Sequence, residues 1–260
     1  MAGKVRVTTV SYLNTKPFLK GLTESSISDE IDLSLEMPSQ SAEKLINGEA
    51  DIGLVPVAAI PHLSNASIFT DYCIGCEGQV KTVCLFGNVS VVEMEKVLLD
   101  YQSRTSVELV KILFSHLWNG YPIYEAGEKG YEDQIVGTTG GVVIGDRTID
   151  LRSKYNFVYD LGEAWHYLTG LPFVFAAWMT TTELSDDFRQ RFNQALGEGV
   201  AKKEEVAQQF QGWYNNFFDV SSYYRDNINF ELDNVKREAI NIFLTYVEGE
   251  QIEDISQSLI

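Results

Sequence analysis

Positive charge is scarce in this sequence. Lysine and arginine together number 20 against 37 aspartates and glutamates, which gives a formal net charge of −17 at pH 7. Nucleic acid and anionic membrane surfaces would repel such a chain, so we expect neither as a partner. A small anionic ligand is still compatible with the charge, provided that helix N-termini, hydroxyls and amides bind it locally.

Cysteines and long apolar runs are also rare. The three cysteines, an odd number, fit a reducing compartment better than a disulfide framework. No run approaches the roughly 18 apolar residues of a membrane-spanning helix. The N-terminus enters a β-branched segment without an apolar signal core. We therefore expect a cytoplasmic protein with no membrane span.

Groups that hold metals or cofactors are sparse. His62, His116 and His166 are scattered without metal-ligand spacing, and Cys73–Cys76 has no second Cys/His pair beside it. The glycine-rich motifs that cradle phosphates or dinucleotides are missing as well. The residues therefore predict no metal site and no phosphate- or dinucleotide-binding motif, and His166 is the one histidine kept as a candidate for proton transfer.

What is present is an alternation of strand and helix patterns. Strands are expected over 4–10, 31–37 and 50–56, with a helix ending near Gly21 between the first two and a helix over 38–47 before the third. This alternation predicts an α/β fold with parallel strands. The remaining chain predicts strands within 67–88 and at 95–100, 121–125, 141–144, 156–159 and 172–178, and helices from 103, over 161–168, and over 186–199, 201–217 and 231–248.

The layout suggests two α/β lobes with a ligand cleft between them. We expect the chain to cross between lobes near Phe86–Val89 and near Trp178–Thr182. The first lobe would then comprise 1–87 and 179–260, with the C-terminal helices packed on it, and the second lobe would comprise 88–178. Clefts in such folds lie at the carboxyl ends of strands and at helix N-termini.

Polar residues cluster after the first strand and at a later helix start. Ser11–Pro17 reads SYLNTKP, which suits either a hydroxyl- and anion-binding loop or an ordinary helix cap. Ser103–Ser106 places three hydroxyls and one arginine at a helix N-terminus, more than a cap requires, and Thr105 with Glu108 has capping-box spacing. Both clusters are candidate anion sites.

A third group combines glycines, acids and aromatic residues. It comprises Gly145-Asp146, Asp160–Trp165 and Thr169–Trp178. Glycine permits close approach of the backbone to a ligand, and aromatic rings can wall an apolar-faced ligand. The alternative is that most of these rings are simply core.

Five segments, in order along the chain, resemble the chorismate dehydratases of the futalosine route of menaquinone biosynthesis. They are VSYLNTKPFLKGL at 10–22, GEADIGLVP at 48–56, SRTSVELVKIL at 103–113, VVIGDRTID at 142–150 and YDLGEAWHYLTGLPFVFAAW at 159–178. Each segment alone is weakly diagnostic, and their order and spacing carry the specificity. The resemblance extends from the first strand to about residue 247.

The resemblance implies a periplasmic-binding-protein type II fold and a cofactor-free lyase. Such an enzyme converts chorismate to 3-[(1-carboxyvinyl)oxy]benzoate with loss of water. Matching motif positions makes Asn14 the expected catalytic residue. The expected substrate-binding residues are Ser11, Tyr12, Thr82, Ser103, Thr105, Ser106, Gly145 and Asp146. Thr82 stands where the family often has serine, which keeps the hydroxyl, while Arg104 occupies a variable position.

Chorismate carries two carboxylates, so the two polar clusters suit it as opposing clamps. No histidine or glutamate falls at a convincing position in the matched motifs. We therefore expect the protein to anchor carboxylates and stabilise a dienolate rather than supply a strong base, with a substrate carboxylate as a candidate proton acceptor.

Three other functions share this fold. A solute-binding protein needs export or tethering, and a regulator's effector domain usually carries a helix-turn-helix segment; neither feature is evident. The sibling enzyme of the same pathway, which forms 1,4-dihydroxy-6-naphthoate, differs in the motifs quoted above. It and a non-catalytic anion-binding protein remain the alternatives.

Overall fold

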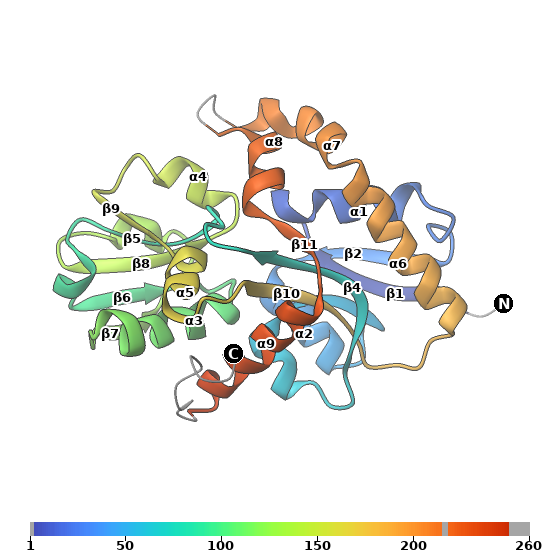
Figure 1. Cartoon of the computed structure of the whole chain (residues 1–260), viewed down its shortest axis with the longest axis horizontal. Coiled ribbons are helices and arrows are strands. Elements are labelled where there is room, and N and C mark those ends of the chain that lie inside the picture. Colours follow the sequence, from blue (N-terminus) through green and yellow to red (C-terminus); the bar gives the residue numbers. More distant parts are fainter. Residues whose placement is uncertain (1–2, 215–217, 250–260) are drawn as a thin grey trace.

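The computed structural model describes residues 3–214 and 218–249 and folds them into two α/β lobes (Figure 1). The first lobe holds a six-stranded sheet with strand order β11-β4-β10-β3-β1-β2, and the second a five-stranded sheet with order β7-β6-β8-β5-β9. The first sheet consists of β1 (Val5–Val10), β2 (Ile31–Glu36), β3 (Ile52–Pro56), β4 (Ser67–Cys76), β10 (Phe173–Thr180) and β11 (Asn229–Glu231). The second consists of β5 (Val83–Gly87), β6 (Lys96–Leu99), β7 (Ile123–Ala126), β8 (Thr139–Ile144) and β9 (Phe157–Asp160). The expected two-lobed α/β class is confirmed.

Helices cover both sheets. They are α1 (Lys16–Glu24), α2 (Pro38–Ile46), α3 (Thr105–Leu113), α4 (Arg147–Leu151), α5 (Leu161–Thr169), α6 (Asp186–Ala201), α7 (Lys203–Phe210), α8 (Val220–Ser222) and α9 (Asn234–Val247). In the first sheet β1 runs parallel to β2 and β3, as expected, and β10 runs antiparallel to β3. Helices lie on both sides of the first sheet (Figure 1). All five residues of β3, an interior strand of this sheet, are buried accordingly.

Helix α1 was expected to end near Gly21, but it continues to Glu24. Gly21 is an interior packing position: a Cβ atom added there would lie 2.0 Å from the carbonyl oxygen of Ala195 on α6. Gly199 of α6 faces α1 in the same way, since an added Cβ would lie 2.0 Å from the carbonyl oxygen of Pro17. The glycine pattern therefore marks close helix packing rather than a helix end.

The chain crosses between the sheets earlier than expected at both places. Strand β5 belongs to the second sheet and β10 to the first, so the crossings lie at 77–82 and 161–172 rather than near 87 and 178. Every residue of β5 is buried, and β10 is almost entirely buried. A uniformly apolar strand carries no pattern that reveals which sheet it joins, and this explains the misplacement.

One buried apolar cluster runs through both lobes. It joins Val7 and Ile52 of the first sheet to Leu109 and Val142 of the second lobe. Helix α6 packs on α1, as expected of the C-terminal helices. Helix α9 also contacts the second lobe, because the centre of its Tyr246 ring lies 5.0 Å from that of His116, just after α3. Among the described residues no helix is long and apolar enough to cross a membrane.

The C-terminal region differs from expectation in its details. The helix expected over 201–217 is α7 followed by a short 3-10 turn at Gln211–Trp213, and residues 215–217 lie outside the described residues. The start of the helix expected over 231–248 is the short strand β11, which pairs antiparallel with β4, and α9 begins only at Asn234. Three-residue strands lie below the length that an alternation pattern can reveal.

Candidate functional site

A cavity lies between the lobes where the strands of the first sheet meet the start of α3. It spans about 560 Å³ when its open mouth is included. The first lobe contributes Val10, Tyr12, Asn14, Pro38, Leu54, Pro56, Ile74, Phe175 and Ala176; the second lobe contributes Val83, Ser103, Thr105, Ser106, Ile144 and Gly145; Val80 belongs to the first crossing. The lining therefore contains hydroxyls, one amide and apolar groups, and none of these residues is ionised.

The loop after β1 presents Asn14 to the cavity. Its backbone is fixed at Leu13, just before Asn14, because the Leu13 N–H donates to Asp146 Oδ1 at 3.0 Å and the Tyr224 hydroxyl donates to the Leu13 carbonyl at 2.7 Å. The Thr15 hydroxyl closes the turn on the Val10 carbonyl at 2.7 Å. Yet the buried Oδ1 of Asn14 itself has no hydrogen-bond partner in the described part of the chain. A buried polar atom normally has a partner, so this amide is available to a ligand.

Helix α3 forms the facing wall, and Ser103, two residues before its first residue, bonds a backbone N–H of its first turn. The Ser103 hydroxyl accepts from the Ser106 N–H at 3.0 Å. The expected capping box of Thr105 with Glu108 is wrong, since Thr105 is the first residue of the helix and its hydroxyl donates to the Phe175 carbonyl at 3.1 Å. Sequence spacing could not separate the two because Ser103–Ser106 and Thr105–Glu108 both have a three-residue interval. The α3 N-terminus remains suited to an anion.

The second lobe also reaches across the cavity through Gly145 and Asp146. Gly145 has φ +68°, and an added Cβ would lie 3.0 Å from the Tyr12 ring. Asp146 is not in the lining; it accepts from Leu13 N–H and from the Tyr214 hydroxyl at 2.9 Å. Burial raises the pKa of Asp146, while these hydrogen bonds oppose the shift. Asp146 thus ties the lobes together beside Asn14.

Two other expected ligand residues lie apart from the cavity lining. Thr82 is buried, and its hydroxyl lies 2.8 Å from that of Tyr223. Ser11 is exposed just before the loop turns inward. The remaining expected residues, namely Tyr12, Asn14, Ser103, Thr105, Ser106 and Gly145, do line the cavity.

The rest of the third group, Asp160–Trp165 and Thr169–Trp178, is mostly structural. Asp160 caps α5 by accepting from Gly162 N–H and Glu163 N–H, and the Trp165 indole donates to the Pro172 carbonyl at 3.1 Å. His166 lies outside the cavity lining, with Nδ1 3.2 Å from the Leu171 carbonyl. The aromatic residues of this motif are largely core, except Phe175, which contributes to the cavity wall.

The described residues provide no metal site. No group of three or more histidine, cysteine, aspartate or glutamate side chains is placed to hold a metal ion within 3–214 and 218–249. Cys73 and Cys76 are free and buried, and burial raises the pKa of Cys73 to about 12. This keeps the thiol protonated and poorly reactive.

Sequence reasoning missed a polar network behind the second-lobe wall. Asp100 follows β6 and has a fully buried side chain, paired with Arg147 at the start of α4. Gln102 links that pair to Tyr12. The available sequence signal was Asp100 itself, an acid directly after strand β6 and shortly before the hydroxyl cluster at Ser103–Ser106.

Solved structures share this architecture. A protein from Archaeoglobus fulgidus matches with a TM-score of 0.72 and 14% identity, covering 95% of this chain and 98% of that chain. The periplasmic aliphatic sulphonate binding protein of Escherichia coli matches with a TM-score of 0.57 and 14% identity, covering 99% and 97%. A Candida albicans gene product described as having the generic periplasmic binding protein fold matches at 0.64 and 11%, covering 96% and 92%. Fold and interlobe cavity thus define a protein of the periplasmic-binding-protein architecture.

Sequence comparison identifies the family within that architecture. The model of the menaquinone biosynthesis family matches residues 5–249, and the chain belongs to this family. It is also 29% identical over 192 residues to a chorismate dehydratase of Thermus thermophilus, in a match that spans 66% of this chain and 70% of that protein. Family and fold agree with those implied by the sequence motifs.

Proposed function

We propose that this chain dehydrates chorismate to 3-[(1-carboxyvinyl)oxy]benzoate. Family membership and the similarity to a chorismate dehydratase support this reaction. The observation that carries it is the Asn14 amide, whose buried Oδ1 lacks a partner in the described chain although the loop around it is fixed. Such a group is prepared for a ligand before the ligand arrives, as catalysis by positioning requires.

The cavity lining suits two parts of this substrate, one carboxylate and the ring. The N-terminus of α3, with Ser103 and Ser106, offers backbone amides and hydroxyls to one carboxylate. The apolar residues Leu54, Ile74 and Phe175 suit the ring. No cofactor enters the proposal, and the cytoplasmic location and the absence of nucleic-acid and membrane partners remain expectations within it.

The reaction balances with the substrate's own groups. The proton leaves the ring carbon that bears the enolpyruvyl ether, and its bonding electrons pass through the adjacent double bond toward the ring carboxylate to form a dienolate. A substrate carboxylate accepts that proton. The electrons then return, the neighbouring hydroxyl departs with a proton as water, and the ring becomes aromatic. Asn14 is assigned the role of orienting the reacting end and stabilising the charge that develops there.

The test is to incubate the purified protein with chorismate, without added cofactor, and to follow products by liquid chromatography and mass spectrometry. We expect a product lighter by one water that carries an aromatic ring. Asn14→Ala should lower kcat by about 100-fold or more, the scale of removing one group that stabilises developing charge. Asn47→Ala is the control, because this exposed asparagine ends α2 away from the cavity.

Full turnover by Asn14→Ala would remove Asn14 from the mechanism. Untouched chorismate that nevertheless raises the melting temperature of the wild-type protein would indicate a binding protein on the same fold. Neither response would direct the assay to the substrate of the sibling naphthoate-forming enzyme.

A further inference from the structure

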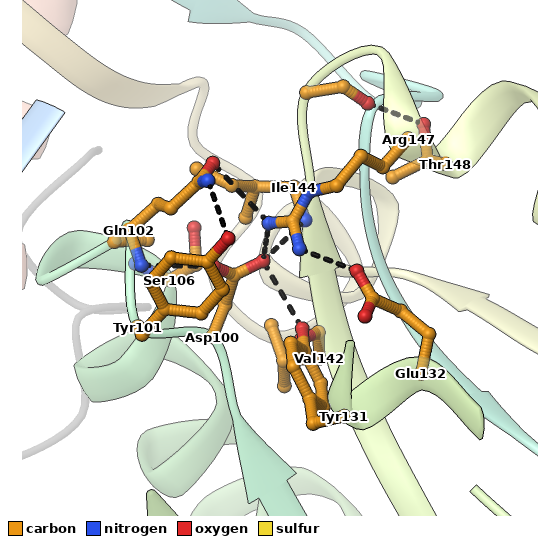
Figure 2. A network of polar contacts seen from close by, with 12 residues as sticks. Asp100, Tyr101, Gln102, Ser106, Tyr131, Glu132, Val142, Ile144, Arg147 and Thr148 are labelled. Carbon is orange, nitrogen blue, oxygen red and sulfur yellow. Dashed lines mark hydrogen bonds and ion pairs between the residues drawn. The ribbon is translucent and has the colours of Figure 1, made fainter. Parts of the chain in front are cut away.

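A buried ionic network supports the second-lobe wall of the cavity (Figure 2). Its centre is Asp100, whose side chain is 0% exposed. Asp100 Oδ1 accepts from the Gln102 N–H at 2.9 Å, and Oδ2 accepts from the Ile144 N–H at 2.9 Å and from the Tyr131 hydroxyl at 3.1 Å. One carboxylate therefore joins the end of β6, which leads to Ser103, to the end of β8, which leads to Gly145.

Arg147 completes the network with a geometry that lysine cannot reproduce. One terminal nitrogen donates to Asp100 and lies 3.3 Å from Gln102 Oε1, while the other donates to Glu132 at 2.5 Å. The guanidinium also lies over the Tyr101 ring, 5.4 Å from its centre. A planar fork with several donors holds three partners at once, which a single ammonium group does less well.

Gln102 extends the network to the opposite wall. Its Oε1 accepts from the hydroxyl of Tyr12 as well as from Arg147, and its Nε2 donates to the Tyr101 hydroxyl at 2.9 Å. These contacts fix which end of the amide faces Tyr12. Tyr12 lines the cavity two residues before Asn14, and its ring rests on Gly145.

The charges of the network argue against a direct electrostatic role toward an anion. Asp100 and Glu132 together carry two negative charges against the single positive charge of Arg147. The cluster therefore adds no net positive potential at the cavity, and its effect there is geometric.

We propose that Arg147, held by Asp100, is a positioning residue that acts through Gln102 to fix Tyr12 and thereby the Asn14 loop. This inference rests on the proposed function for its kinetic consequences, whereas the link from Arg147 to Tyr12 stands on geometry alone. Substitution of Arg147, Gln102 or Tyr12 breaks the same chain of contacts. The losses of activity that these substitutions cause should therefore not multiply when they are combined.

The experiment is a double-mutant cycle on Gln102→Leu and Tyr12→Phe, with Arg147→Met and Arg147→Lys measured alongside. Gln102 is uncharged and only partly buried, and Arg147 keeps both of its ion pairs when Gln102 is replaced. The Gln102→Leu variant therefore leaves no buried charge unpaired and is suited to folding. We expect Gln102→Leu to lower kcat/KM for chorismate by about tenfold or more, since misplacement of a site by 1 Å can cost about 100-fold. Arg147→Lys should lose less than Arg147→Met. Arg191→Met is the matched control, because Arg191 also binds two carboxylates, Glu30 and Asp187, but on α6.

Positioning predicts that the double variant loses no more activity than Gln102→Leu alone. Independent, multiplying losses would overturn the inference, as would an Arg147→Met variant equal to Arg191→Met. The urea midpoints of unfolding are measured for the same four proteins, which requires no substrate. Strictly additive shifts of the midpoint for Gln102→Leu and Tyr12→Phe would overturn the link between these residues even if chorismate is not turned over. An inactive wild-type protein with a coupled urea cycle would instead overturn only the proposed function.

Discussion

At the scale of single residues, Gly145 in the cavity wall combines a left-handed backbone with a tight contact to Tyr12. Gly145 has a left-handed backbone with φ +68°, and a Cβ added there would lie only 3.0 Å from the Tyr12 ring, which would have to shift. Gly137 has φ +59° but no neighbour within 4 Å of an added Cβ. The two glycines share the backbone requirement and differ only in the contact.

Gly145→Ala should therefore cost more than Gly137→Ala. Both changes carry the left-handed strain of about 1 kcal/mol, and only the first also displaces Tyr12. We expect Gly145→Ala to lower the free energy of unfolding by about 2 kcal/mol and to reduce kcat/KM, with Gly137→Ala costing about half as much and retaining activity. Urea unfolding and steady-state kinetics measure both effects. Equal kinetics for the two variants would show that the Tyr12 contact is dispensable.

How far the sequence determined the site is also clearest at this scale. Tyr12, Asn14, Ser103, Thr105, Ser106 and Gly145 were expected at a ligand and line one cavity, because short polar motifs at strand and helix ends carry local information. Asp146 and Thr82 were also expected at the ligand; they lie outside the cavity lining and contact Leu13 and Tyr223. Such partners lie more than 100 residues away in the sequence, where no spacing rule reaches.

At the scale of elements, one carboxylate organises both crossings between the lobes. Asp160 ends β9 and caps α5, and it also accepts from the N–H groups of Val80 at 3.1 Å and Lys81 at 2.7 Å. Lys81 lies in the first crossing and has φ +63°, a conformation that side-chain-bearing residues rarely adopt. Burial raises the pKa of Asp160, and the backbone hydrogen bonds oppose that shift. The sequence placed Asp160 only in the third group of candidate residues, and neither of these two roles was predicted.

Asp160→Ala should be far more destabilising than loss of an ordinary cap. Four backbone N–H groups would lose their acceptor, and we expect a cost of about 3 kcal/mol or more in the free energy of unfolding. Ser185→Ala is the control, because the Ser185 hydroxyl caps α6 through one backbone N–H, that of Phe188; it should cost about 1 kcal/mol. Chemical denaturation of both variants measures the difference, and similar costs would mean that the crossings do not depend on Asp160.

At the scale of the whole molecule, alternating strands and helices were enough to predict two lobes, but not where the chain passes between them. Strands β5 and β10 are apolar except for Thr180 at the end of β10, and one buried cluster continues from one lobe into the other. Because both sheets draw on the same apolar core, neither composition nor periodicity marks a boundary. The polar residues of the cavity, by contrast, lie at strand and helix ends, where sequence signals are strongest.

The uncharged cavity has a consequence for the speed of encounter. A dianionic substrate must approach a chain of net charge −17 and enter a cavity whose lining offers no cation to attract it. Diffusional encounter is then slowed by repulsion rather than accelerated by steering, and dissolved salt screens the repulsion. Raising sodium chloride from about 20 mM to about 300 mM should increase kcat/KM for chorismate about two- to fivefold through a lower KM, with kcat as the internal control. A KM that rises steeply with salt would instead reveal a cationic approach path, and the association rate of this protein would be set by attraction rather than by its acidity.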